Sequence, residues 1–326
     1  MMVYRSAILI VGVLVITGGT ITLSSWQSPT SPQPETTQTP AQPATASVER
    51  ASVPFNQAPI PDNEFGKIAE QGKMIFNNPS LYASQYVGNS LTCSNCHLDS
   101  GTKAGSAPLW AAYVSYPAYR SKNNHVNSFQ ERLQGCFRFS MNGKAPALGS
   151  PELVALESYA WWLAKGTAIN PDEIGRGFTK LSKPAKPADY ARGQIVYQER
   201  CAMCHAADGS GQTDNNGHVT FPALWGDKSF NWGAGMGSIT NAAAFIRANM
   251  PYSQGNTLSI QQSWDVALYM DSHDRPQDPR FTGSVEETRQ KYHNSASSMY
   301  GKVVNGSLLG SVSTPSGGRL NEKEAQ

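Results

Sequence analysis

Two short runs of the sequence carry residue types that can hold a metal-containing cofactor. Each has two cysteines three positions apart, followed directly by a histidine: Cys93-Ser94-Asn95-Cys96-His97 and Cys201-Ala202-Met203-Cys204-His205. At this spacing two thiols can bond to the two vinyl groups of one porphyrin, and the histidine then lies under the iron as an axial ligand. The pattern predicts two covalent haem c groups, attached through Cys93, Cys96, His97, Cys201, Cys204 and His205.

The same cysteines could instead form zinc half-sites or disulfides. A structural zinc site needs further Cys or His pairs at short spacing. The chain has 5 cysteines, so Cys136 is the one outside the two motifs. The haem interpretation therefore accounts for the pattern better.

The amino-terminal segment predicts export. Tyr4-Arg5 precede an apolar run from residue 7 to about residue 23, which is typical of a signal segment. We expect residues 1–26 to be an export signal or an uncleaved anchor that tethers the protein to the inner membrane, and the protein to be periplasmic. The formal net charge is +2 over 326 residues, which argues against a nucleic-acid partner.

Two stretches repeat one plan. Short helical patterns at residues 65–76 and 189–197 precede the two motifs, and each contains a glycine, Gly72 or Gly193. Because glycine inside a helix costs about 1 kcal/mol relative to alanine, we expect a close helix–helix approach at both. Each copy ends in a second helical pattern, which Ser150 caps in the first copy and Ser259 in the second.

The order of helix, attachment motif, long loop and closing helix resembles the small class I cytochrome c fold. We therefore predict a mainly α protein with two such domains in tandem, each enclosing one haem c. Residues 27–61 are rich in Pro, Thr and Gln and predict a disordered linker. The expected parts that follow are the first haem domain at 62–182, a Pro/Lys/Ala linker at 183–188, the second haem domain at 189–275 and an extension with a disordered end at 276–326.

The distal ligand of the second haem is expected from the loop before the closing helix. Met250, followed by Pro251, lies there, and a thioether on iron raises the reduction potential. Met236 in a Gly-rich run and Met270 inside the closing helix are the competitors. Met250 is the preferred metal ligand, together with His205.

Cys136 occupies the matching position of the first half. As a thiolate it would be the distal ligand opposite His97, favouring Fe(III) and placing a nucleophilic sulfur beside an electron acceptor. Two alternatives stay open: a buried apolar cysteine, or ligation by Met141 or His125 with Cys136 as a neighbour.

Basic residues surround Cys136 in the sequence. Between residues 101 and 144 one acid, Glu131, stands among the cations Lys103, Arg120, Lys122, Arg132, Arg138 and Lys144. Some of these will pair with haem propionates or face solvent, and the rest can bind a small oxyanion, which suits the arginine fork. Ser140 could add a hydrogen bond if the turn after Cys136 is helical.

With these residues the chain closely resembles the TsdA-type thiosulfate dehydrogenases, over about residues 65–281. The resemblance rests on the two attachment motifs and on the runs at 135–143 and 245–251. It implies His97 and Cys136 ligation at an active-site haem in a catalytic first domain, and a second domain that relays electrons. Arg132 and Ser140 match substrate-pocket positions of the family, whereas Lys122 and Arg138 are added from their charge. Some members have a lysine before the ligand methionine, where this chain has Asn249, so we expect Met250 to bind in both oxidation states.

The resemblance also implies a reaction. Two thiosulfates would be coupled into tetrathionate, in either direction, through a Cys136–S–SO3 adduct, and the electrons would leave through the second haem to a small high-potential cytochrome. Two other functions are weighed: an electron carrier without substrate chemistry, and a SoxA-like enzyme that loads thiosulfate onto a carrier protein.

Overall fold

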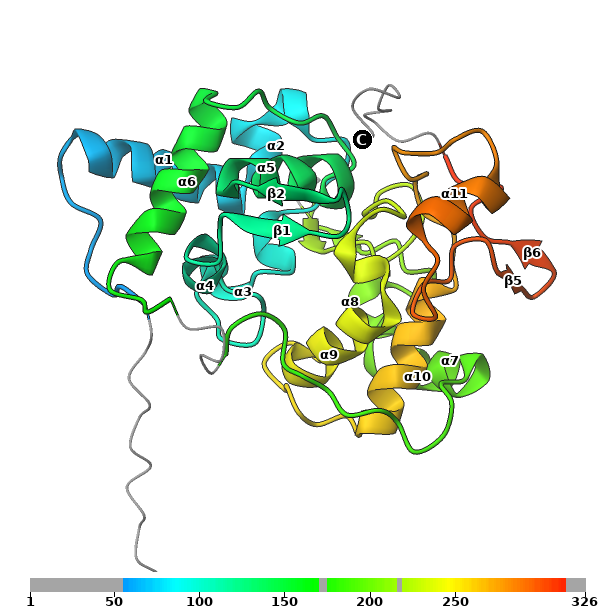
Figure 1. The fold of residues 1–326 in the computed structure, drawn as a ribbon. Coiled ribbons are helices and arrows are strands. Elements are labelled where there is room, and N and C mark those ends of the chain that lie inside the picture. The colour runs from blue at the N-terminus through cyan, green and yellow to red at the C-terminus, as the bar shows by residue number, and fades with distance from the viewer. Residues whose placement is uncertain (1–54, 170–174, 216–218, 315–326) are drawn as a thin grey trace, which may run out of the picture. The chain divides into compact units, whose positions relative to one another are not determined.

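The computed structural model describes residues 55–169, 175–215 and 219–314, shown in Figure 1. The expected export segment, most of the expected linker and the end of the chain lie outside these residues. Among the described residues, no helix combines the length and apolar character needed to cross a membrane.

The first half consists of short helices and one hairpin. Its regular elements are α1 (Glu64–Asn77), α2 (Pro79–Tyr82), α3 (Leu98–Gly101), α4 (Leu109–Tyr113), β1 (Ala118–Arg120), β2 (His125–Asn127), α5 (Phe129–Gly135) and α6 (Pro151–Ala164). A single π-helical turn, Cys136–Ser140, follows α5 directly.

The second half repeats this helical plan and adds two further hairpins. Its elements are α7 (Tyr190–Arg200), α8 (Ala202–His205), β3 (Gln212–Thr213), β4 (Val219–Phe221), α9 (Ile239–Asn249), α10 (Ile260–Asp271), α11 (Val285–Tyr292), β5 (Val303–Val304) and β6 (Ser307–Leu308). Each of the strand pairs is antiparallel. The prediction of a mainly α protein is confirmed.

The first and last helices of each half cross in the same way, as the sequence predicts. A Cβ added to Gly72 of α1 would lie 2.0 Å from the carbonyl oxygen of Ala155 in α6, and one added to Gly193 of α7 would lie 2.1 Å from that of Asp265 in α10. Only glycine allows the backbones to approach so closely. The expected caps are also present, since the Ser150 hydroxyl accepts from Leu153 N–H and Ser259 from Gln262 N–H.

Two apolar cores follow from these crossings. One is built on α1, α4 and α6 and includes Trp110 and Phe137. The other is built on α7, α9 and α10, and residues of the extension, Met299, Tyr300 and Leu309, complete it. The extension thus contributes to the second core.

The expected disordered linker does not reach as far as residue 61. Phe55 and Ile60 pack against the first core, and the backbone N–H of Asn56 donates to the carbonyl of Leu163 at 2.9 Å. Residues 55–61 therefore pack at the end of α6, because Phe55 and Ile60 supply large apolar side chains.

Candidate active site

The first attachment motif forms one tight turn. The residues Cys93–Asn95 make a single 3-10 turn, and His97 N–H donates to the Cys93 carbonyl at 3.0 Å, which brings the cysteines and the histidine together. The Nδ1 of His97 contacts the Ala107 carbonyl at 2.6 Å, so Nε2 stays available for iron. Burial lowers the pKa of His97 to about 4, which keeps the imidazole in the neutral, ligating form.

The second attachment motif has the same geometry. His205 N–H donates to the Cys201 carbonyl at 2.9 Å, and Nδ1 of His205 contacts the Pro222 carbonyl, also at 2.9 Å. All five cysteines of the sequence lie in described residues, and none of them forms a disulfide. The described residues contain no cluster of three or more His, Cys, Asp or Glu that could hold another metal ion. The two turns fit covalent haem c.

Arg132 and Cys136 form the central contact of the first domain. Helix α5 begins with a capping box, in which Ser128 and Glu131 satisfy each other's backbone N–H groups. One helical turn later Nη1 of Arg132 donates to Cys136 Sγ at 3.0 Å. Cys136 raises the pKa of Arg132, so a guanidinium cation lies directly beside this sulfur.

The Cys136 sulfur also lies near the first attachment cysteines. Burial raises the pKa of Cys96 to about 12, and the charge of Cys136 adds to that rise. The structure also places the two alternative ligands of the first half, His125 and Met141. His125 is on β2, where its side chain is 58% exposed and Nε2 is 3.2 Å from Glu131 Oε1, and Met141 is 2% exposed inside the first core.

Lys122 is a third charged residue near this pair. It lies in the turn between β1 and β2, and its side chain is accessible to solvent, yet the protein that surrounds the ammonium group lowers its pKa to about 7. Nearby Arg280 and Arg132 add to that lowering, whereas Asp278 opposes it. The Nζ donates to the Gly233 carbonyl and lies 3.6 Å from the centre of the Phe139 ring.

Ser140 and Arg138 lie where the two haem domains meet. The Ser140 carbonyl accepts from Nδ2 of Asn89 at 2.9 Å, and the Arg138 carbonyl accepts from Nδ2 of Asn231 at 2.8 Å. The turn that holds both residues is π-helical, with Met141 N–H donating to the Cys136 carbonyl. The Nε of Arg138 is buried and meets no hydrogen-bond partner among the described residues.

Helix α9 positions Met250 at its C-terminal end. Met250 is half-buried against the second core, whereas Met236 packs against the first core and Met270 is buried within the helix packing of the second. Asn249, the residue before Met250, is buried, and its Nδ2 donates to the Phe245 carbonyl at 3.1 Å.

Sequence reasoning missed the residues that the extension adds beside Lys122. Asp278, Arg280 and His293 form a buried ionic cluster that reaches Phe139. The sequence holds an Asp and an Arg two positions apart, but no periodicity marks them, and the contact spans more than 130 positions.

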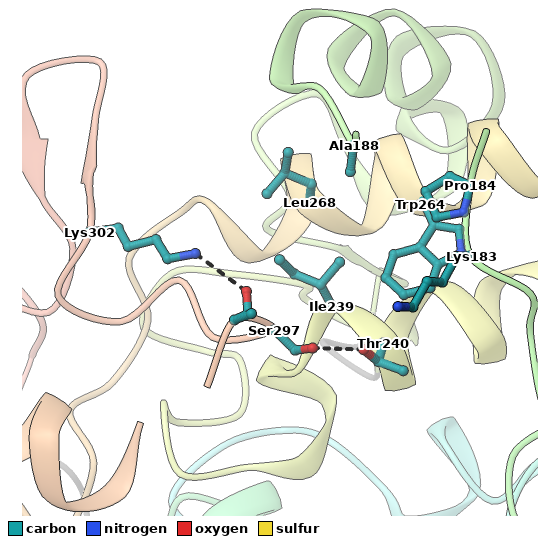
Figure 2. A pocket seen from close by; sticks show the side chains of 10 residues that line it. Lys183, Pro184, Ala188, Ile239, Thr240, Trp264, Leu268, Ser297 and Lys302 are labelled. Atoms are coloured by element: carbon teal, nitrogen blue, oxygen red, sulfur yellow. Dashed lines mark hydrogen bonds between the residues drawn. The ribbon is translucent and has the colours of Figure 1, made fainter. Parts of the chain in front are cut away.

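A separate pocket of about 390 Å³ is lined by residues of the 183–188 linker, α9, α10 and the extension. Figure 2 shows Ile239 and Leu268 at its centre, with Lys183 and Lys302 reaching it from opposite ends. None of the site residues predicted from the sequence lines it, so it is distinct from the site around Cys136.

Two family models match the chain, one in each half. The model described as "SoxA/TsdA, cytochrome c domain" matches residues 79–169, and the model described as "Cytochrome c" matches residues 190–274. Together with the two attachment turns, these matches define a c-type cytochrome with two domains in tandem and one covalent haem c in each.

Full-length relatives narrow this class to a family. The thiosulfate dehydrogenase of Thiomonas intermedia is 58% identical over 262 residues, which are 80% of this chain and 83% of the relative. That of Stutzerimonas stutzeri is 51% identical over 259 residues, 79% and 84% of the two chains. The chain belongs to the family of TsdA-type thiosulfate dehydrogenases, which are enzymes, as the sequence motifs predict.

A solved structure agrees with this assignment. The thiosulfate dehydrogenase TsdBA of Marichromatium purpuratum superposes with a TM-score of 0.76 at 44% identity. The match covers 79% of this chain and 57% of that one, so the chain spans little more than half of the solved protein.

Proposed function

We propose that this protein couples two thiosulfate ions into one tetrathionate ion, at Cys136. The observation that carries the proposal is the Arg132 guanidinium 3.0 Å from the Cys136 sulfur, near the cysteines of the first attachment motif. Charge-assisted contacts of this kind favour the thiolate, which is the nucleophilic form of cysteine. The similarity to enzymes named thiosulfate dehydrogenase supplies the substrate.

Binding of the substrate requires positive charge. Two thiosulfate dianions 4 Å apart repel each other by about 4 kcal/mol in water, from four times the unit-charge value, and by more in a drier site. Arg132 and Lys122 offset this repulsion, and the Ser140 hydroxyl can donate one further hydrogen bond. These cations also orient the sulfane sulfur of thiosulfate toward Cys136.

Cys136 then carries one thiosulfate covalently. A bond forms between Sγ and the sulfane sulfur, giving Cys–S–S–SO3⁻ and releasing two electrons. A second thiosulfate attacks that sulfane sulfur, so the bond to Sγ breaks, tetrathionate leaves and the Cys136 thiolate is restored. The sum is two thiosulfates to one tetrathionate and two electrons, and it can run in either direction.

The two haems, when bound, supply the one-electron acceptors that these two electrons need. His97 and Cys136 would hold the first iron, and His205 and Met250 the second. A thioether ligand raises the potential relative to a thiolate, so electrons leave through the second domain to a small high-potential cytochrome. This chemistry belongs in the periplasm, with the amino-terminal segment as signal or tether.

Two variants of Cys136 test the proposal in the haem-loaded protein. We expect Cys136→Ala to lose thiosulfate-dependent ferricyanide reduction and tetrathionate formation, and Cys136→Met, which keeps a neutral sulfur, to lose them too. The control is the spectrum of the second haem, which should stay unchanged. Full activity in Cys136→Ala would refute the mechanism, and reduction of the wild type by thiosulfate without tetrathionate would refute the product.

A further inference from the structure

The extension after the second domain places an ionic cluster against the first domain. The carboxylate of Asp278 accepts from Arg280 through Nε at 3.0 Å and Nη2 at 2.7 Å, and from Nε2 of His293 at 2.9 Å. Asp278 is 1% exposed and Arg280 7%. Because buried charges persist only when they are paired, this cluster is a fixed part of the structure.

Phe139 is the point at which the cluster meets the active site. The guanidinium of Arg280 lies 4.9 Å from the centre of the Phe139 ring, and the ammonium of Lys122 lies 3.6 Å from it. Phe139 belongs to the π-helical turn of Cys136 and Ser140. Packing here is tight, since a Cβ on Gly233 would lie 2.3 Å from that ring and 3.0 Å from Oδ2 of Asp278.

We propose that Arg280 is a positioning residue for the active site: by neutralising Asp278 and packing on Phe139, it keeps the Lys122 ammonium at the Phe139 ring and the Gly233 carbonyl, next to the turn of Cys136, where it can bind the substrate. The inference rests on the proposed function of the same site and assigns a role in it to the extension. Neither family match reaches beyond residue 274, so this role would belong to a segment outside both cytochrome domains.

The charges around Lys122 explain why Arg280 matters. Lys122 faces Arg280, Arg132 and Arg120, which repel it, and Asp278, which attracts it, while His293 contacts Asp278 from the end of α11. In the wild type, the guanidinium of Arg280 already makes two hydrogen bonds to Asp278. Without the Arg280 guanidinium, the buried Asp278 carboxylate would keep its hydrogen bonds from the backbone N–H of residue 280 and from His293 but would lose its paired cation. Lys122, a cation on the same Phe139 ring, is then the charge that can replace it.

The expected result of removing Arg280 is therefore a Lys122 that turns toward Asp278 and away from the substrate. In the haem-loaded enzyme, with thiosulfate as substrate and ferricyanide as acceptor, we expect Arg280→Gln to raise KM about tenfold, within the range for coupled neighbouring charges, and to change kcat little. The double variant Asp278→Asn/Arg280→Gln removes the attracting charge as well, and its KM should return to within about threefold of wild type.

Two controls separate this effect from general damage to the extension. Lys291 is an exposed cation 5.2 Å from the centre of the neighbouring Tyr292 ring, and it does not contact Phe139, so Lys291→Gln should leave KM unchanged. Arg280→Lys keeps the positive charge and should keep KM within about threefold of wild type. If Arg280→Gln fails to fold, Arg280→Lys tests the proposal by itself. A tenfold rise in the KM of Arg280→Lys would then contradict the charge-based role of Arg280.

The outcomes are distinct. A wild-type enzyme that does not oxidise thiosulfate would refute the proposed function itself. An active wild type with an unchanged KM in Arg280→Gln, or a double variant as impaired as the single one, would refute the inference alone.

Discussion

The sulfur of Cys136 lies beside a guanidinium group. An inert structural cysteine is normally surrounded by apolar side chains, whereas this one is half-buried and 3.0 Å from Nη1 of Arg132. The contact depends on α5 continuing into the π-helical turn, because residues four positions apart then share one helix face. The contact between Arg132 and Cys136 is therefore made within one continuous stretch of the chain.

Loss of the Arg132 charge should weaken the reaction strongly. A hydrogen bond to a charged group contributes about 1.5–3 kcal/mol, so we expect Arg132→Gln to lower kcat/KM for thiosulfate by roughly 10- to 150-fold. Steady-state kinetics with ferricyanide measure this. The matched control is Arg120→Gln, since the Arg120 side chain is exposed and contacts the Tyr116 hydroxyl. Unchanged kinetics in Arg132→Gln would remove Arg132 from the site.

The charge of Lys122 should make substrate binding depend on pH. The pKa of Lys122 is lowered to about 7, chiefly by its surroundings and by Arg280. Its ammonium is therefore lost as the pH rises through 7, so KM for the thiosulfate dianion should be constant below about pH 6 and rise above pH 7. Asp278, whose pKa is lowered by Arg280 despite its burial, and Arg132, whose pKa is raised by Cys136, stay charged across this range. Burial lowers the pKa of His293, which stays neutral.

Two replacements of Lys122 provide the comparison. Lys122→Arg keeps its charge at every pH in question, so its KM should be low and independent of pH. Lys122→Met lacks the charge, so its KM should be high and equally independent of pH. A wild-type KM that does not change between pH 6 and 9 would contradict the prediction.

The sequence reveals the local half of this site and misses the distant half. Arg132 and Cys136 are separated by four positions, and charge counting around Cys136 also identifies Lys122. Arg280 reaches the site because the extension packs against Phe139 of the first domain. No pattern in residues 276–284 predicts that contact. Contacts of this length are decided by tertiary packing, so a single sequence does not reveal them.

At the level of elements, the two helix crossings hold each attachment motif against its closing helix. Gly72 and Gly193 let the backbones touch, and the caps at Ser150 and Ser259 fix where α6 and α10 begin. These features follow from local rules, and the sequence predicts them. Helices α5 and α9, which lie in the loops between motif and closing helix, were not predicted from the sequence. The Ser128–Glu131 capping box was the available signal for the start of α5.

Adding one methyl group at the first crossing should destabilise the fold. In Gly72→Ala the new Cβ would meet the Ala155 carbonyl at 2.0 Å, so α1 and α6 must separate. Overpacking costs about 1–3 kcal/mol, and at a backbone contact this close we expect it to exceed the gain of about 1 kcal/mol in helix propensity. Thermal denaturation should show a Tm lower by several degrees. Met74→Ala, on the exposed side of α1, is the control and should change Tm little.

On the scale of the whole described chain, two asparagines join the haem domains. Asn231 is fully buried, and it donates through Nδ2 to the Arg138 carbonyl and to Oδ1 of Asn142, while its own Oδ1 accepts from Gly233 N–H. Asn89, in the first domain, donates through Nδ2 to the carbonyl of Ser140 in the same domain and to that of Ser229 in the second domain. The turn that carries Cys136 is thus tied directly to the second domain.

Removing Asn231 should uncouple the two domains. Asn231→Ala leaves the Arg138 carbonyl and the Gly233 N–H without partners, at about 1–3 kcal/mol for each buried group. Calorimetry should show a broader or divided unfolding transition, and reduction of the second haem should lag behind the first in rapid mixing with thiosulfate. Asn241→Ala, which removes a contact within the second domain, is the control. A single sharp transition at the wild-type Tm would show that the domains are joined by other contacts.

The extension that completes the second core has a practical consequence for expression of the second domain by itself. Tyr300 is fully buried there, with Met299 and Leu309 beside it. A fragment ended where the second family match stops, at residue 274, would expose that apolar surface to water and should aggregate. Expression of residues 183–314 retains these side chains, and comparing the soluble yield of the two fragments would show how far a homology boundary differs from a folding boundary.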